Sequence, residues 1–329
     1  MNPPPSCRVC GAARLVPAGH VEYFQGYDWP VWDCGACGCR LTRHDSEVHD
    51  RFHASGAISY YSDYRALAAT CKALFDAGQR DELRATLGRT AKYQFIIEQL
   101  GRPDPRLKVL EIGCARGFLT SCFILDGWNV TGVDVSPEAV NAAKAAFGDH
   151  FVLDTDPALA AGAPYDVIYH VGMIGCVSDP LGLTRDLLAR LRPEGRLLFN
   201  APNRGALHLR GQAWLDSAPP PDLVTLFPEC FWQRHFGPSA DVVEQVETVP
   251  PFKAAEIGLR VLLQRRWQPP DPKPLAAAGA QGHSWAQESG SVARLVERVL
   301  LKIARTTGLA ALAPRRPSDF GLFVQMTKR

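Results

Sequence analysis

From Leu107 onward, short apolar runs alternate with amphipathic stretches. Short apolar runs bounded by turn residues are typical of buried strands, and apolar residues three or four apart are typical of helices. This alternation predicts an α/β domain with a mainly parallel sheet. The five predicted strands are Lys108–Ile112, Asn129–Val133, His150–Leu153, Tyr165–Val171 and Arg196–Phe199.

Amphipathic stretches between these strands predict the helices that cover the sheet. They are Phe118–Asp126, Pro137–Phe147 and Pro180–Leu191. Two of the helices have well-marked starts, because Ser136 and Asp179 each precede a proline. Serine and aspartate are good N-cap residues, and proline is favoured at the first helical position.

The regular order loosens after the fifth strand. We interpret Leu259–Arg265 and Gly321–Thr327 as the final strands, with a proline-rich linker at Gln268–Pro274. Apolar positions within Val292–Thr307 predict an amphipathic helix, whose face we expect to pack on the domain rather than to form a dimer or lid surface. Residues 268–312 therefore form a predicted insertion before the last strand.

The N-terminal part of the chain has a different texture. Residues 1–58 are rich in cysteine, glycine, aromatic residues and turn formers, with no helical period, as in a small metal-bound module. Residues 59–106 return to helical spacing, which predicts two connecting helices. The predicted organisation is thus a module at 1–58, a connecting segment at 59–106 and a main domain at 107–329.

Composition and charge exclude several classes of protein. Lys and Arg number 36 against 34 Asp and Glu, without long basic runs, which argues against a nucleic-acid partner. No stretch of about 18 apolar residues suggests a membrane span, and the N-terminus lacks the features of a secretory signal. We expect a cytoplasmic protein, monomeric or homodimeric.

Half of the ten cysteines precede residue 40. In a reducing compartment this placement favours metal binding over disulfides. Two Cys-x-x-Cys-Gly turns can supply four thiolates to one tetrahedral ion, so the predicted structural zinc ligands are Cys7, Cys10, Cys34 and Cys37. Cys39, His44 and His49 remain alternatives for a place in the shell.

A glycine-rich turn follows the first predicted strand of the domain. The strand ends at Glu111 and turns through small residues directly into a helix. Such a turn brings backbone N–H groups close to a ligand. It does not match the nicotinamide dinucleotide fingerprint, because the third and sixth positions from Gly113 hold Ala115 and Phe118.

Acidic residues end the neighbouring strands. Asp134 and Asp154 follow the second and third predicted strands. Ligands of open parallel sheets bind beyond the carboxyl ends of the strands. We therefore expect Glu111 and Asp134 side by side, with a carboxylate available to the hydroxyls of a ribose, and Asp154 near an adenine.

These motifs, taken in order, resemble a known family. They are Glu111-x-Gly113-x-x-x-Gly117, Asp134, Tyr165-Asp166-Val167-Ile168 and Leu191-Arg192-Pro193-Glu194-Gly195. Over about Leu107–Asn203 the chain looks like a class I, S-adenosylmethionine-dependent methyltransferase, and the N-terminal module is similar to that of a subset with a zinc ribbon. The resemblance implies a Rossmann-like, seven-stranded, mostly parallel sheet with an antiparallel last strand.

The resemblance also implies S-adenosylmethionine as cofactor. The residues that it places around the cofactor are Glu111, Gly113, Cys114, Ala115, Gly117, Phe118, Asp134, Val135, Asp154 and His170. Tyr60 and Tyr61, in a tyrosine-rich stretch after the ribbon, resemble an arm that folds over the cofactor in similar enzymes.

The likeness to small-molecule and sugar methyltransferases implies methyl transfer to an oxygen of a sugar or secondary metabolite. Where many relatives have Glu-His-Val, this chain has Gly175-Cys176-Val177, so the base must come from elsewhere. The candidate catalytic residues are His170, His208 and Asp222. Two alternatives are an RNA or protein methyltransferase that uses the ribbon for recognition, and a non-catalytic cofactor-binding scaffold.

Overall fold

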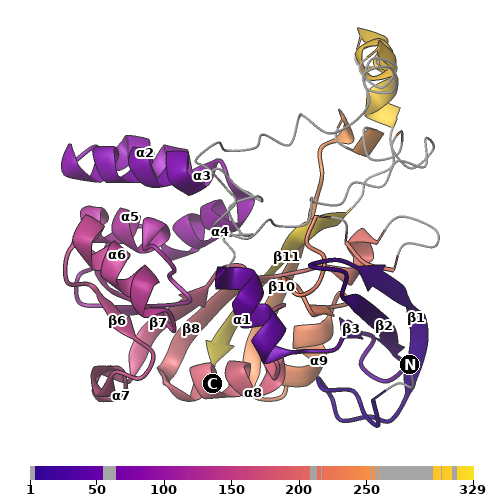
Figure 1. Cartoon of the computed structure of the whole chain (residues 1–329). Coiled ribbons are helices and arrows are strands. Elements are labelled where there is room, and N and C mark those ends of the chain that lie inside the picture. The colour runs from indigo at the N-terminus through magenta and orange to yellow at the C-terminus, as the bar shows by residue number, and fades with distance from the viewer. Residues whose placement is uncertain are drawn as a thin grey trace.

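A seven-stranded sheet forms the centre of the computed structural model, which describes residues 4–54, 64–207, 213–215, 217–252, 254–255, 259, 299–304, 306–312 and 317–329 (Figure 1). From one edge to the other, the strands are β10 (Ala240–Thr248), β11 (Pro317–Lys328), β8 (Leu191–Ala201), β7 (Tyr165–His170), β4 (Lys108–Ile112), β5 (Asn129–Asp134) and β6 (Phe151–Leu153). The pairs from β8 to β6 are parallel. β11 lies between β8 and β10 and is antiparallel to both, which confirms the predicted sheet.

Helices cover both faces of this sheet. Successive side chains of a strand point to opposite faces, so apolar side chains on both faces are buried against helices. On one face lie α2 (Tyr64–Asp76), α3 (Arg80–Gly88), α4 (Ala91–Leu100), α5 (Phe118–Asp126) and α6 (Pro137–Phe147). On the other lie α7 (Pro157–Gly162), α8 (Pro180–Ala189) and α9 (Phe231–Phe236). Within β4, Val109 packs against the helices α2–α6, and Leu110 packs on the opposite face, with α7–α9.

The predicted helix starts are confirmed. The Ser136 side chain accepts a hydrogen bond from the Ala139 N–H, and the Asp179 side chain accepts one from the Gly182 N–H. In both helices the cap precedes a proline in the first turn, so local sequence is sufficient to set where α6 and α8 begin.

The N-terminal module forms a second, small sheet. β1 (Leu15–Glu22), β2 (Asp28–Cys34) and β3 (Arg40–Thr42) are antiparallel, and β3 also pairs with β9 (Thr225–Leu226), which comes from the segment after β8. Figure 1 shows β1–β3 on the side of the molecule away from α2 and α6. Trp32 and Leu41 share one apolar core with Phe199 of the main sheet. The module is therefore packed into the domain.

The helices before β4 differ from the prediction. The described residues from 64 to 100 form three helices, α2–α4, not two. Thr90 has extended backbone and separates α3 from α4, although the apolar positions keep a helical spacing across it. The segment 1–58 also contains a helix, α1 (Ser46–Ala54), which its mixed composition did not predict.

The strand expected at Leu259–Arg265 is wrong at its first residue, because Leu259 is helical; residues 260–265 lie outside the described residues. The strand at the far side of β11 is β10, in which five of the nine residues are polar or charged. β10 lies at the edge of the sheet and is mostly exposed along its length, so it needs few apolar residues. This is why its sequence did not stand out.

Smaller differences concern element ends. α8 ends at Ala189, two residues before the predicted end, because Leu191 already begins β8. The short helices α7 and α9 were not predicted. Of the helix expected at Val292–Thr307, residues 299–304 are helical, whereas residues 292–298 and 305, like the linker Gln268–Pro274, lie outside the described residues.

Among the described residues, no helix is both long and apolar enough to cross a membrane.

Glycines at the two ends of α5 provide a matched test of packing. Gly117 and Gly127 both have left-handed backbone, with φ of 76° and 90°. A Cβ atom at Gly117 would lie 2.5 Å from the ring of Phe151, whereas one at Gly127 would meet nothing within 4 Å. We expect Gly127→Ala to lower the free energy of unfolding by about 1–2 kcal/mol from backbone strain alone. Gly117→Ala should lower it by about 2–5 kcal/mol, because overpacking is added.

Urea denaturation of both variants measures the difference. Equal losses for the two variants would contradict the close packing of Gly117 on Phe151.

Candidate functional site

The turn after β4 is held against the neighbouring strand. The N–H groups of Gly113 and Cys114 both donate to the Val133 carbonyl, at 2.8 and 2.9 Å. Gly113, Ala115 and Gly117 have positive φ angles of 71°, 47° and 76°. This backbone shape brings the turn close over the carboxyl ends of β4 and β5.

Asp134 lies beside this turn at the end of β5. Its Oδ2 accepts a hydrogen bond of 2.8 Å from the Ala115 N–H, and its Oδ1 accepts one of 2.9 Å from the Ser136 N–H. The side chain is half-buried. Because a carboxylate has about four lone-pair directions, Asp134 can accept further hydrogen bonds from hydroxyl groups of a ligand.

Val135 and Asp154 complete a group at the same edge. Val135 is 74% exposed, which is unusual for an apolar side chain next to a strand end. The Asp154 N–H donates to the Asp134 carbonyl at 3.2 Å, and its side chain is exposed. An apolar surface between two carboxylates suits a flat heterocycle that carries a sugar on one side and polar groups on the other.

Glu111 is a neighbour of Asp134 across the sheet, but its environment differs. The carboxylate is buried beneath α5, where Oε2 accepts hydrogen bonds from the hydroxyls of Thr120 and Tyr169, the latter at 3.0 Å. Burial raises the pKa of Glu111 to about 7, and the charge of Asp134 adds to this, while the two hydrogen bonds oppose it. Glu111 thus joins the end of β4 to α5 and β7 through hydrogen bonds, which supports the glycine-rich turn.

His170 is fully buried on the opposite face from Glu111. Its ring stacks on Phe199 at a centroid distance of 4.7 Å, and neither ring nitrogen has a hydrogen-bond partner in the described part of the chain. Burial lowers the pKa of His170 to about 3. A neutral imidazole of this kind is a poor proton acceptor at neutral pH.

The other residues expected around the cofactor fall into two groups. The side chains of Cys114 and Phe118 are buried in the core under the turn, so only their backbone faces the edge of the sheet. Tyr60, Tyr61 and His208 lie outside the described residues.

The loop after β7 lies over the glycine-rich turn. A Cβ atom at Gly113 would lie 3.1 Å from the Met173 sulfur. The start of the loop is fixed by a hydrogen bond of 2.8 Å from the Gly172 N–H to the buried Asn200 side chain. The loop is therefore adjacent to any ligand bound at the turn.

Asp222 and Lys92 face this loop from two different elements. A Cβ atom at Gly172 would lie 3.3 Å from Lys92 Nζ. Burial raises the pKa of Asp222 to about 6, whereas the charge of Lys92 lowers it. Neither side chain forms an ion pair within the described ranges, and both remain partly accessible to solvent. A deeply placed carboxylate with a free oxygen can take up a proton from a ligand.

Cys176 lies in the same loop and is also influenced by Asp222. Burial raises the pKa of its thiol, with a further increase from the charge of Asp222. Its Sγ donates to the Gly172 carbonyl at 3.7 Å. The thiol is therefore protonated at neutral pH, and a nucleophilic role is not supported.

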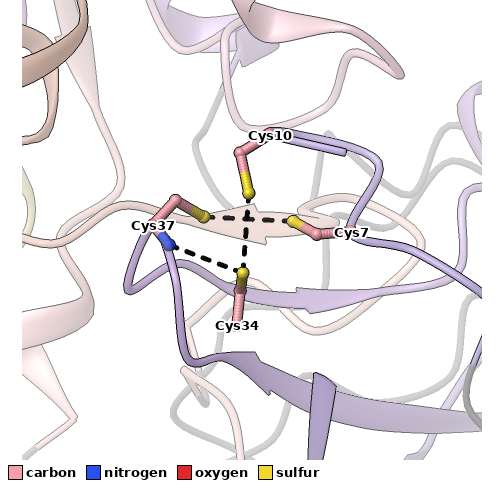
Figure 2. A group of neighbouring side chains, drawn as sticks. All are labelled: Cys7, Cys10, Cys34 and Cys37. Carbon is pink, nitrogen blue, oxygen red and sulfur yellow. Dashed lines mark hydrogen bonds between the residues drawn. The ribbon is translucent and has the colours of Figure 1, made fainter. Parts of the chain in front are cut away.

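Cys7, Cys10, Cys34 and Cys37 form one cluster in which all sulfur atoms lie within 4.8 Å of one another. Figure 2 shows the four side chains pointing to a common centre, two from each Cys-x-x-Cys turn. The Cys7–Cys37 and Cys10–Cys34 sulfur distances are 3.9 and 3.6 Å. A tetrahedral shell with Zn–S bonds of about 2.3 Å has sulfur–sulfur edges of about 3.8 Å, so the cluster fits zinc.

Both turns have the same backbone geometry. The N–H of Gly11 donates to the Cys7 carbonyl at 2.7 Å, and that of Gly38 donates to the Cys34 carbonyl at 2.9 Å. Both glycines have left-handed φ angles, 76° and 78°. The glycine that follows each Cys-x-x-Cys pair is thus required by the turn.

The alternative ligands do not enter this cluster. His44 and His49 pack on each other, with ring centroids 5.9 Å apart. Cys39 is fully buried and directly precedes β3. Among the described residues, the group that can hold an ion consists of the four predicted cysteines.

Sequence reasoning did not identify Lys92, Met173 or Arg8 as parts of this region. Lys92 and Met173 belong to an ordinary helix and an ordinary loop, and only the fold brings them to the glycine-rich turn. Arg8 stands inside a Cys-x-x-Cys turn, and that position is the one signal that could have pointed to it.

Comparison with known proteins supports one family. Residues 81–236, just under half of the chain, match the family model described as a methyltransferase domain. A ubiquinone biosynthesis O-methyltransferase from Parvibaculum lavamentivorans is 31% identical over 122 residues, which cover 35% of this chain and 48% of that protein. One from Vibrio campbellii is 32% identical over 104 residues, or 30% and 44% of the two chains. The chain thus spans about half the length of the curated relatives it matches.

Solved structures show a weaker likeness. A methyltransferase from Archaeoglobus fulgidus has a TM-score of 0.40 and 14% identity, covering 76% of this chain and 94% of that chain. A plantazolicin methyltransferase has a TM-score of 0.38 and 16% identity, covering 86% and 98%. The assignment does not depend on these two similarities. Residues 81–236 are thus similar to a methyltransferase domain, and the glycine-rich turn, Asp134 and the sheet order agree with the resemblance to class I, S-adenosylmethionine-dependent methyltransferases.

Proposed function

We propose that the protein transfers a methyl group from S-adenosylmethionine to an oxygen of a small-molecule acceptor, such as a sugar or secondary metabolite. The observation that carries this proposal is that the glycine-rich turn beside Asp134 lies close to the loop that Asp222 faces, and Asp222 forms no ion pair within the described residues. The similar curated proteins are named O-methyltransferases, which supports oxygen as the acceptor atom.

The cofactor would lie along the edge formed by β4, β5 and β6. Asp134 is proposed to accept the ribose hydroxyls, Val135 to contact the adenine ring and Asp154 to lie near its amino group. The backbone from Gly113 to Phe118 would surround the methionine portion, with Met173 next to it. Bound cofactor supplies a methyl group that is already activated by the positive sulfonium.

Asp222 is our candidate for the proton acceptor. As the new bond forms between the acceptor oxygen and the methyl carbon, the bond from that carbon to sulfur breaks and the hydroxyl proton passes to the Asp222 carboxylate. The nearby Lys92 charge favours the ionised form of this carboxylate. His170 is too buried and too weak a base for this role, and His208 stays a prediction.

Zinc is proposed to occupy the four-cysteine cluster in a structural role. Four thiolates fill a tetrahedral shell and leave no open position for a substrate, as expected for a structural ion. Closing the two turns around one ion would fix the start of the chain against β2 and β3.

Asp134→Ala should weaken binding of S-adenosylhomocysteine, the demethylated product, by about 100-fold. Two hydrogen bonds to a charged carboxylate contribute about 1.5 kcal/mol each, and their loss is about 3 kcal/mol. Isothermal titration calorimetry measures the affinity. Asp149→Ala, an exposed change just before β6, is the matched control and should bind as wild type. Unchanged affinity of the Asp134 variant would remove this residue from the cofactor site.

The pH profile tests Asp222, using the acceptor that a screen with labelled methyl identifies. Because only the ionised carboxylate accepts a proton and its pKa is about 6, kcat/KM should fall as the pH drops below about 6. Lys92→Gln removes the charge that lowers this pKa, so the fall should begin at higher pH. Asp222→Asn should reduce kcat by about 10²–10⁴-fold. A profile that is the same in wild type and Lys92→Gln would contradict the assignment.

Metal analysis tests the cysteine cluster. Protein purified without chelators should contain about one zinc per chain, and Cys34→Ser should lose it, whereas Cys230→Ser, an exposed cysteine outside the cluster, should keep it. Since the module shares a core with the main sheet, chelation should lower the melting temperature of the whole domain. Zinc content well below one per chain, or a melting temperature that chelation leaves unchanged, would overturn the proposal.

A further inference from the structure

Arg8 is the second residue of the first Cys-x-x-Cys turn, and its side chain extends out of the module toward the methyltransferase domain. Nη1 donates to the carbonyls of Val177 and Ser178, at 3.0 and 3.1 Å. Nη2 donates to the Val224 carbonyl at 2.5 Å and to the Thr225 hydroxyl. Nε donates to the Thr42 carbonyl at 3.4 Å.

Four of the five oxygen atoms that Arg8 contacts belong to the two segments that carry Cys176 and Asp222. These loops are also joined to each other, because the N–H groups of Val224 and Thr225 both donate to the Gly175 carbonyl, at 2.9 and 3.0 Å. Arg8 therefore binds at the junction of the loop after β7 and the segment that leads into β9.

The guanidinium uses all of its donors in this junction. A guanidinium has five N–H groups, and Arg8 makes five contacts to oxygen atoms. No carboxylate pairs with it in the described part of the chain. A half-buried guanidinium whose hydrogen bonds all go to loop and strand oxygens holds those segments in one arrangement.

We propose that Arg8 is a positioning residue through which the four-cysteine turn sets the two acceptor-side loops of the methyltransferase site. Cys7 and Cys10 flank Arg8, so an ion that closes the cluster fixes the backbone from which the guanidinium extends. The acceptor role of these loops rests on the proposed function, whereas the mechanical link from the cluster to the loops does not.

Arg204 offers a matched control. Its Nη1 donates to the Gly38 carbonyl at 2.6 Å, and its Nη2 pairs with Asp33 at 3.1 Å. Arg204 thus also ties a Cys-x-x-Cys turn to the main domain, but through the second turn and without contact to Val177 or Val224.

Hydrogen–deuterium exchange of the full chain, resolved to single amides, tests the link without any substrate. In Arg8→Ala, the amides of Cys176, Val224 and Thr225 should exchange at least about tenfold faster than in wild type, because their segments lose four hydrogen bonds. Arg8→Lys, with three donors on a flexible stem, should show most of this increase. Arg204→Ala should leave these three amides unchanged.

Chelation of the wild-type protein should accelerate the same amides, and chelation of Arg8→Ala should add little further acceleration there. The link is refuted if the three amides exchange as in wild type in both Arg8 variants, or if Arg204→Ala accelerates them equally. Calorimetry with S-adenosylhomocysteine separates the two hypotheses. Wild-type protein that does not bind it refutes the proposed function alone, while Arg8→Ala that exchanges faster and binds it normally supports the positioning role.

Discussion

The close packing of the Phe151 ring against Gly117 and Gly132 holds together the edge of the sheet that forms the candidate ligand site. A Cβ atom at either glycine would lie within 2.7 Å of this ring, so the turn after β4 and strand β5 approach each other only because both positions lack a side chain. This approach allows Gly113 and Cys114 to donate to Val133. The position of Asp134 beside the turn follows from the same constraint.

Carboxylates near this edge differ in their chemistry because they differ in depth. Asp134 is half-buried and receives two backbone hydrogen bonds, which leaves its oxygen atoms able to accept further hydrogen bonds from ligand hydroxyls. Glu111 is buried under α5, where its pKa rises to about 7, and it acts as part of the foundation of the turn. Asp222 lies deep but keeps a free oxygen, and its pKa near 6 leaves it ionised yet basic at neutral pH.

The N-terminal module is a structural component of the domain to which it is attached. Three kinds of contact join them: the β3–β9 pairing, the shared apolar core, and the arginines Arg8 and Arg204. A small module with one metal cluster has little core of its own. Its cysteine turns are therefore well placed to transmit their geometry to the loops after β7 and before β9.

Local sequence determined the features that depend on neighbouring residues along the chain. The parallel strands β4–β7, the capped starts of α6 and α8, the glycine-rich turn and the two cysteine turns were all predictable, because each is specified by periodicity, capping or conformational preference within about ten residues. The meeting of the two cysteine turns in one cluster also followed, since four thiolates at this spacing suit one ion.

Tertiary structure decided what depends on contacts between distant segments. The edge strand β10 needs few apolar residues and so carried no clear pattern, and β9 exists only because β3 is beside it. The burial that gives Glu111, His170 and Asp222 their different pKa values comes from elements far apart in the chain. Four of the five hydrogen-bond partners of Arg8 lie about 170–220 positions away, beyond the reach of any local pattern. Strand and turn identities were thus set locally, whereas the depth and the partners of each charged group were set by the packing of the folded chain.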